Sequence, residues 1–127
     1  MTRVYRGLKR MLLCIDDSPA VLEYKRALFE RSGYVVVTAA SPRQGLNLAM
    51  MSSFDVVLVD YHMPEMNGHQ VALEIRRVRP ETPVVMFSGS EIPEETHRLV
   101  DAVVPKDAAI GELLPTVDRI CKRPSPA

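Results

Sequence analysis

The sequence predicts an α/β fold in which helices cover both faces of a doubly wound, five-stranded parallel sheet. Two observations lead to this prediction. Short apolar runs alternate along the chain with segments of helical pattern, five of each. The runs are continuously apolar rather than alternating in polarity, which is typical of parallel strands buried on both faces. The expected strands span residues 9–15, 34–39, 55–59, 83–87 and 101–104.

The first two helices have clear start signals. Ser18-Pro19 and Ser41-Pro42 each place a capping hydroxyl before a proline suited to the first helical position. Apolar residues with helical spacing follow the first signal, and Gly33 can end that helix in a left-handed conformation. We therefore expect helices after the first and second strands.

The remaining helices are less regular. Residues 63–68 carry turn chemistry and precede a helix marked by the spacing of Val71, Ile75 and Val78. Segment 90–98 is short for a helix. The last helix contains Pro115, which must either lie in its first turn or kink it.

Composition limits the class of protein. The 127 residues fit one domain. Its 16 basic residues balance 16 acidic residues, so the chain lacks the excess of basic residues that is typical of nucleic-acid-binding proteins. The two cysteines suggest no disulfide framework, so a reducing cytoplasm is expected, and no apolar run is long enough to span a membrane. We expect a basic tail at 1–8, the domain at 9–122 and a disordered tail at 123–127.

Polar residues follow four of the expected strands. Asp16 and Asp17 follow the first, Asp60 the third, Ser88 the fourth, and Lys106 comes just after the fifth. Sites in open α/β sheets form outside the carboxyl ends of the strands, so one shared site is predicted.

The residue types indicate the chemistry of this site. Two carboxylates about 4 Å apart repel by roughly 4 kcal/mol at an effective dielectric near 20, so a cluster of three calls for a cation. Oxygen ligands favour Mg²⁺, which phosphate oxygens often complete. Lys106 and Ser88 suit a phosphoryl group, and Asp60 is the natural nucleophile for an acyl phosphate. The blander interpretation is that Asp16 and Asp17 only cap the first helix.

With these pieces in order, the chain resembles a response-regulator receiver domain of two-component signalling, similar to a chemotaxis regulator, over roughly residues 9–122. The matching stretches are Asp16-Asp17-Ser18-Pro19, Asp60 to Gly68, Ser88-Gly89 and Lys106. The resemblance implies the flavodoxin-like strand order 2-1-3-4-5.

The resemblance also implies a role for each site residue. Asp60 would be the phosphoacceptor. Asp17, Asp60 and the backbone carbonyl of His62 would bind Mg²⁺, and Asp16 would act through water. Ser88, Gly89 and Lys106 would bind the phosphoryl group.

Three features depart from the family pattern. The order Pro105-Lys106-Asp107 replaces the usual Lys-Pro, so the sequence leaves open whether Lys106 reaches the phosphoryl group. Val103 stands where receivers commonly have a switching aromatic, and the interval between Ser88 and Lys106 is short. We therefore expect a short fourth helix, and a monomer or weak dimer.

The predicted function is a stand-alone receiver, not an enzyme, that accepts a phosphoryl group on Asp60 with Mg²⁺ from a sensor histidine kinase or histidine phosphotransfer protein. A changed protein-binding surface would then act on a downstream protein target, without direct contact to nucleic acid or membrane. One alternative is a pseudo-receiver that binds partners independently of phosphate. Another is a small magnesium-dependent phosphohydrolase, for which the chain lacks an evident general acid or base.

Overall fold

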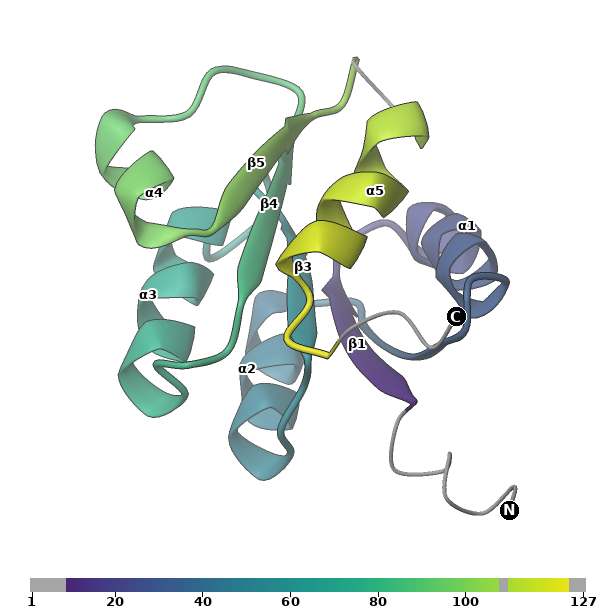
Figure 1. Ribbon diagram of the computed structural model, residues 1–127. Helices are drawn as coiled ribbons and strands as arrows, with labels where there is room; N and C mark the ends of the chain where they lie inside the picture. Colours follow the sequence, from purple (N-terminus) through teal and green to yellow (C-terminus); the bar gives the residue numbers. More distant parts are fainter. Residues whose placement is uncertain (1–8, 108–109, 124–127) are drawn as a thin grey trace.

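The predicted sheet is confirmed in the computed structural model, which describes residues 9–107 and 110–123. Five parallel strands lie in the order β2-β1-β3-β4-β5, and Figure 1 shows β1, β3, β4 and β5 following one another across the sheet. The strands are β1 (Arg10–Ile15), β2 (Tyr34–Ala39), β3 (Val56–Asp60), β4 (Val84–Ser88) and β5 (Ala102–Pro105). The helices are α1 (Pro19–Glu30), α2 (Pro42–Met51), α3 (Gly68–Val78), α4 (Glu94–Leu99) and α5 (Ile110–Ile120).

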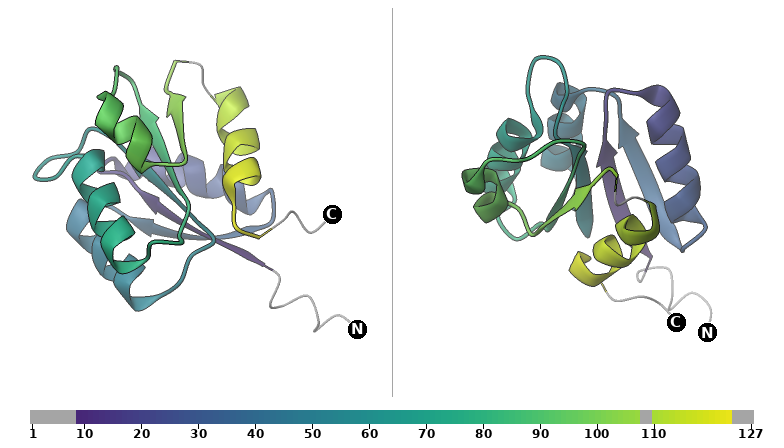
Figure 2. Two further views of the ribbon diagram at one scale, coloured as in Figure 1. Left: turned by 60° about the vertical axis from the view of Figure 1, so that its left-hand side comes forward. Right: turned by 90° about the horizontal axis from the view of Figure 1, so that it is seen from above.

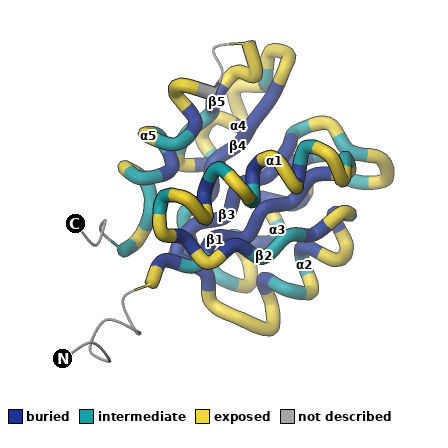
Figure 3. Tube along the Cα trace, turned by 90° about the vertical axis from the view of Figure 1, so that its right-hand side faces the viewer, coloured by how far each residue is buried: buried dark blue, intermediate teal, exposed yellow. Residues whose placement is uncertain are grey.

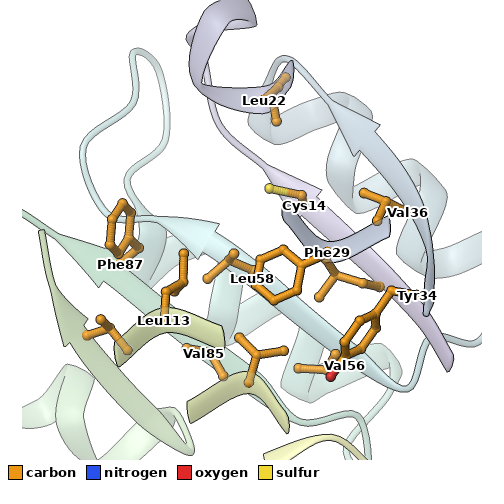
Figure 4. Close-up of a cluster of buried hydrophobic side chains, with 13 residues drawn as sticks. Cys14, Leu22, Phe29, Tyr34, Val36, Val56, Leu58, Val85, Phe87 and Leu113 are labelled. Atoms are coloured by element: carbon orange, nitrogen blue, oxygen red, sulfur yellow. The ribbon is translucent and has the colours of Figure 1, made fainter. Parts of the chain in front are cut away.

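Helices cover the sheet in two layers. Figures 1 and 2 show α1 and α5 on one face, and α2, α3 and α4 on the other. The core is divided accordingly into two clusters. In the first, Phe29 of α1 and Leu113 of α5 pack over Leu58 of β3 (Figure 4). In the second, Val71 and Ile75 of α3 pack on the opposite side of the same strands.

The strands are buried on both faces, as continuously apolar runs predict. Every residue of β3 and β4 is buried, and Figure 3 shows a buried sheet surrounded by helices with exposed outer faces. Cys14 lies in this core, where burial raises the pKa of its thiol to about 12. It acts there as a small apolar side chain.

The expected helix signals are used. The hydroxyls of Ser18 and Ser41 accept hydrogen bonds from the amides of Val21 and Gln44. Gly33 has φ +92°, the left-handed conformation predicted after the first helix. Pro115 lies inside α5 rather than in its first turn.

Three strands end one residue later than predicted. Asp60, Ser88 and Pro105 are the last residues of β3, β4 and β5 instead of following them. Their backbones continue the ladder even though two of the side chains are polar. The shift leaves the site residues at the carboxyl edge of the sheet, as expected.

The predicted tails fall mostly on residues 1–8 and 124–127, outside the described residues. Arg123, assigned to the second tail, is described, and its Nε lies 3.2 Å from Asp55 Oδ1. Arg10, part of the basic stretch at the start of the chain, is buried with 1% exposure. Its guanidinium pairs with Asp118 Oδ1 at 2.9 Å and links β1 to α5.

Candidate functional site

Asp60 occupies the centre of the candidate site. It ends β3, a strand flanked by β1 and β4, and its side chain is only 3% exposed. Apolar neighbours in the sheet fix its position, because Asp60 is in register with Phe87 of β4. A buried carboxylate of this kind needs compensating groups nearby.

Two further carboxylates converge on Asp60. Ligand oxygens of Asp16, Asp17 and Asp60 all lie within 4.8 Å of one another. Asp16 is buried and Asp17 is exposed, so the cluster has a protected side and an open side. The carboxylates predicted to form one site are therefore together.

Lys106 completes the site from the far side of β4. Its Nζ lies 2.7 Å from Asp60 Oδ1. Pro105 has no N–H to donate, and the amide of Lys106 donates to the carbonyl of Ser88 at 2.8 Å instead. The reversed Pro-Lys order thus brings the lysine to Asp60, with no cis peptide bond among the described residues.

Burial dominates the electrostatics of Asp60. It raises the pKa of the carboxyl above its usual value, while the Lys106 ammonium lowers that pKa and the Asp16 carboxylate raises it further. Apart from the ion pair with Lys106, Oδ1 of Asp60 is buried without a hydrogen-bond donor among the described residues. Three converging carboxylates with one nearby ammonium fit a hard divalent cation such as Mg²⁺.

Ser88 lies at the edge of this site with its hydroxyl engaged locally. The hydroxyl donates to the carbonyl of Ser90 at 2.9 Å and accepts from the amide of Ser90 at 3.1 Å. Gly89 lies against the stem of Lys106, since a Cβ added to it would be 3.6 Å from Lys106 Cδ. A phosphoryl group bound by the Ser88 hydroxyl would have to replace the bond to Ser90.

The loop after Asp60 is shaped by its turn residues. Glu65 has φ +74°, and Asn67 forms a reciprocal capping box with Gln70 at the start of α3. Gly68 is the first residue of that helix and packs against the backbone of Asp60. A Cβ at Gly68 would lie 2.9 Å from the Asp60 carbonyl oxygen and 2.5 Å from Met86 Sδ, so a side chain is excluded there.

Two histidines link this loop to the next one. His62 is exposed, and its Nε2 lies 2.7 Å from Ser90 Oγ. His69 is partly exposed at the start of α3. Its Nδ1 lies 2.8 Å from Oγ1 of the fully buried Thr96 in α4.

The region after Ser88 has the expected unusual form. Helix α4 has only six residues and no side-chain cap at Pro93. Val103 is partly buried in β5, and no aromatic occupies its position. A cleft of about 490 Å³, lined in part by Ser88, Val103 and Asp107, opens beside the site.

Sequence reasoning missed Lys25. It is 1% exposed, and its Nζ lies 3.2 Å from Asp16 Oδ2. A signal was present, because Leu22, Lys25 and Phe29 share the buried stripe of α1 at helical spacing. A lysine in such a stripe indicates a buried partner of opposite charge.

A doubly wound sheet with three carboxylates, a hydroxyl and a lysine at its carboxyl edge defines the receiver class of signalling domains. Residues 12–117 match the family model described as the response regulator receiver domain. The chain belongs to this family, whose members act in two-component signalling.

Known proteins agree with this assignment. The transcriptional regulatory protein GlrR of Escherichia coli is 32% identical over 120 residues, which cover 91% of this chain and 27% of the relative. The chain thus spans about a quarter of the length of that relative. The chemotaxis protein CheY4 of Vibrio cholerae is 27% identical, with a TM-score of 0.79 over 87% of this chain and 98% of that chain.

A third similar protein was solved in complex with a histidine kinase. The response regulator TrrA of Thermotoga maritima, in complex with the histidine kinase ThkA, is 25% identical to this chain. Its TM-score is 0.80 over 87% of this chain and 97% of that chain. Across residues 9–107 and 110–123, no helix has both the length and the apolar character needed to cross a membrane.

Proposed function

We propose that this receiver accepts a phosphoryl group on Asp60 from the phosphohistidine of a sensor kinase or phosphotransfer protein. The observation that carries the proposal is the position of Asp60, buried at the strand end within 4.8 Å of two other carboxylates and 2.7 Å from Lys106. The complex of the neighbour TrrA with a histidine kinase supports a partner of this kind.

The transfer requires few groups from the protein. The N–P bond of the donor phosphohistidine breaks, a P–O bond to a carboxylate oxygen of Asp60 forms, and the donor imidazole is released. Phosphoryl transfer depends mainly on positioning and charge stabilisation, which a site without a general acid or base can supply. We propose an acceptor of this kind rather than an enzyme that turns over a separate substrate.

Each neighbouring residue has a role in this proposal. Asp17, Asp60 and the backbone carbonyl of His62 would hold Mg²⁺, and Asp16 would act through water. When bound, the ion would neutralise negative charge at the site. Lys106 would pair with the phosphoryl oxygens, and the Ser88 hydroxyl and Gly89 backbone would lie against them.

A phosphorylated Asp60 would act through the protein surface. The added group carries about 1.5 to 2 negative charges, and it would draw Ser88 away from its bonds with Ser90. Ser90 also contacts His62, so both loops beside the site would respond. We propose that a downstream protein recognises the changed surface.

Intact-protein mass spectrometry tests the proposal. The protein is incubated with Mg²⁺ and acetyl phosphate or phosphoramidate, beside Asp60→Asn and a control variant, Glu81→Gln, which changes an exposed carboxylate before the start of β4. We expect a gain of one phosphoryl group in the wild type and in Glu81→Gln. The gain should vanish in Asp60→Asn and when EDTA removes the metal. No gain in the wild type would instead favour a phosphate-independent binding module.

A further inference from the structure

Lys25 is a buried charge that the receiver chemistry described above does not use. It lies in the apolar stripe of α1 between Leu22 and Phe29, and only 1% of it is exposed. Burying an ammonium is costly unless anionic or aromatic groups compensate it. Its surroundings therefore indicate what it does.

Those surroundings belong to the acidic site. Nζ of Lys25 lies 3.2 Å from Asp16 Oδ2 and 4.3 Å from the centroid of the Phe87 ring. The same ring lies 5.5 Å from Lys106 Nζ. Two lysines thus share one aromatic ring, and each pairs with a different carboxylate of the cluster.

The contact occupies Asp16 as well as Lys25. Oδ1 of Asp16 accepts a hydrogen bond from the amide of Ser18 at 2.9 Å, and Oδ2 faces the ammonium. An ammonium at this distance repels any divalent cation placed against the same oxygen. Direct binding of a cation by Asp16 would therefore require that the pair with Lys25 be weakened.

We propose that Lys25 is a positioning residue of the cation site, a fixed positive charge that neutralises Asp16 and weakens the binding of Mg²⁺ to the carboxylate cluster. The inference rests on the proposed function, since it concerns the same cation. It adds that the affinity for the ion is set partly by a lysine beneath the site. A purely structural Lys25 would affect stability and leave the affinity unchanged.

Isothermal titration with Mg²⁺ tests this inference on the wild type, Lys25→Met and Lys25→Arg. Methionine keeps the length of the side chain and suits the apolar stripe, while arginine keeps the charge. Lys122→Met is the matched control, because Lys122 lies far from the site. Its backbone amide donates to the carbonyl of Asp55, which precedes β3, whereas Asp60 is the last residue of that strand. We expect Lys25→Met to bind Mg²⁺ about tenfold more tightly or better, since a charge several ångströms away contributes strongly even at an effective dielectric near 20. Lys25→Arg and Lys122→Met should stay within about twofold of the wild type on the same grounds.

The outcomes separate this inference from the proposed function. If the wild type binds Mg²⁺ and Lys25→Met binds it with equal or weaker affinity, the role of Lys25 is overturned and the proposed function is not affected. No binding of Mg²⁺ by any of the proteins would overturn the metal site itself, and the role of Lys25 with it. If Lys25→Met fails to fold, the double variant Asp16→Asn/Lys25→Met removes both charges of the pair. That variant should bind Mg²⁺ more tightly than Asp16→Asn alone, and equal affinities would refute the role of Lys25.

Discussion

Lys106 Nζ lies 2.7 Å from Asp60 Oδ1, although Lys106 follows β5, Asp60 ends β3, and β4 lies between these two strands. The lysine reaches across the end of β4 beside Gly89, which presents no side chain to its stem. The contact joins a side chain that is 40% exposed to a carboxylate that is 3% exposed. Lys106 therefore extends from the solvent-exposed surface to the buried carboxylate at the centre of the site.

Replacing Lys106 by methionine should impair phosphorylation more than folding. The ammonium is the charge nearest to Asp60, and preorganised charge is a major source of transition-state stabilisation. We expect Lys106→Met to accept phosphate from phosphoramidate at least about tenfold more slowly, measured as a time course of intact mass. The far-ultraviolet circular dichroism should be unchanged, and Lys122→Met should react at the wild-type rate. A wild-type rate in Lys106→Met would show that the ion pair does not assist the transfer.

Asp60→Asn should stabilise the metal-free protein at neutral pH. Burial raises the pKa of Asp60, so the folded protein holds this proton more tightly than the unfolded chain. The contribution of Asp60 to stability is therefore complete below its unfolded pKa and is lost as the pH rises through the folded pKa. At pH 7 the ionised, buried carboxylate lowers the free energy of unfolding, and asparagine removes this charge.

The comparison is made by urea denaturation in EDTA over a range of pH. The variant should exceed the wild type in free energy of unfolding at pH 7, and the difference should shrink as the pH falls through the folded pKa of Asp60. A difference that grows on acidification would contradict this assignment of the raised pKa.

Gly68→Ala and Gly111→Ala should have opposite effects. A Cβ at Gly68 would lie 2.5 Å from Met86 Sδ and 2.9 Å from backbone atoms of Asp60 and Tyr61, so α3 would have to shift. Such overpacking costs roughly 1–3 kcal/mol and would displace the loop that follows Asp60. A Cβ at Gly111 meets no atom within 4 Å, so alanine in that helix should be neutral or stabilising by up to about 1 kcal/mol. Thermal unfolding checks both variants, and equal melting temperatures would count against this packing.

The ion pair between Arg10 and Asp118 should respond asymmetrically to truncation. Arg10 has 1% side-chain exposure and Asp118 has 38%, so Asp118→Ala leaves a buried charge whose described partners are only the Ser32 carbonyl and the Tyr34 ring. Breaking a buried pair in this way costs about 3–5 kcal/mol. Arg10→Met leaves a carboxylate that water can reach and that still accepts from the Tyr34 hydroxyl, so we expect a smaller loss of about 1–2 kcal/mol. Urea denaturation of the two variants gives the order, and a larger loss in Arg10→Met would reverse this interpretation.

Much of this structure could be predicted because the informative residues are local in the sequence. Continuous apolar runs fix parallel strands, and the polar residue at the end of each run marks the carboxyl edge. Asp60 and Ser88 nevertheless belong to their strands, since a hydrogen-bonded ladder does not stop at the first polar side chain.

The buried charges could not be placed in the same way. Arg10 resembles the basic residues before it, and its partner Asp118 comes 108 residues later on α5. Lys25 lies in the second turn of α1, and it pairs with Asp16 only because the helix turns back over the end of β1. Whether Lys106 reaches Asp60 depended on backbone geometry after Pro105, which the residue order alone left open.

The bond between the Lys106 amide and the Ser88 carbonyl has a consequence for how receivers are recognised in sequence data. A search pattern that requires lysine followed by proline would reject this chain, although its lysine reaches the acidic residue. The feature that survives the exchange is the register, in which the lysine comes one residue after the strand partner of Ser88. A pattern written in terms of strand register, with proline allowed on either side of the lysine, would keep such chains.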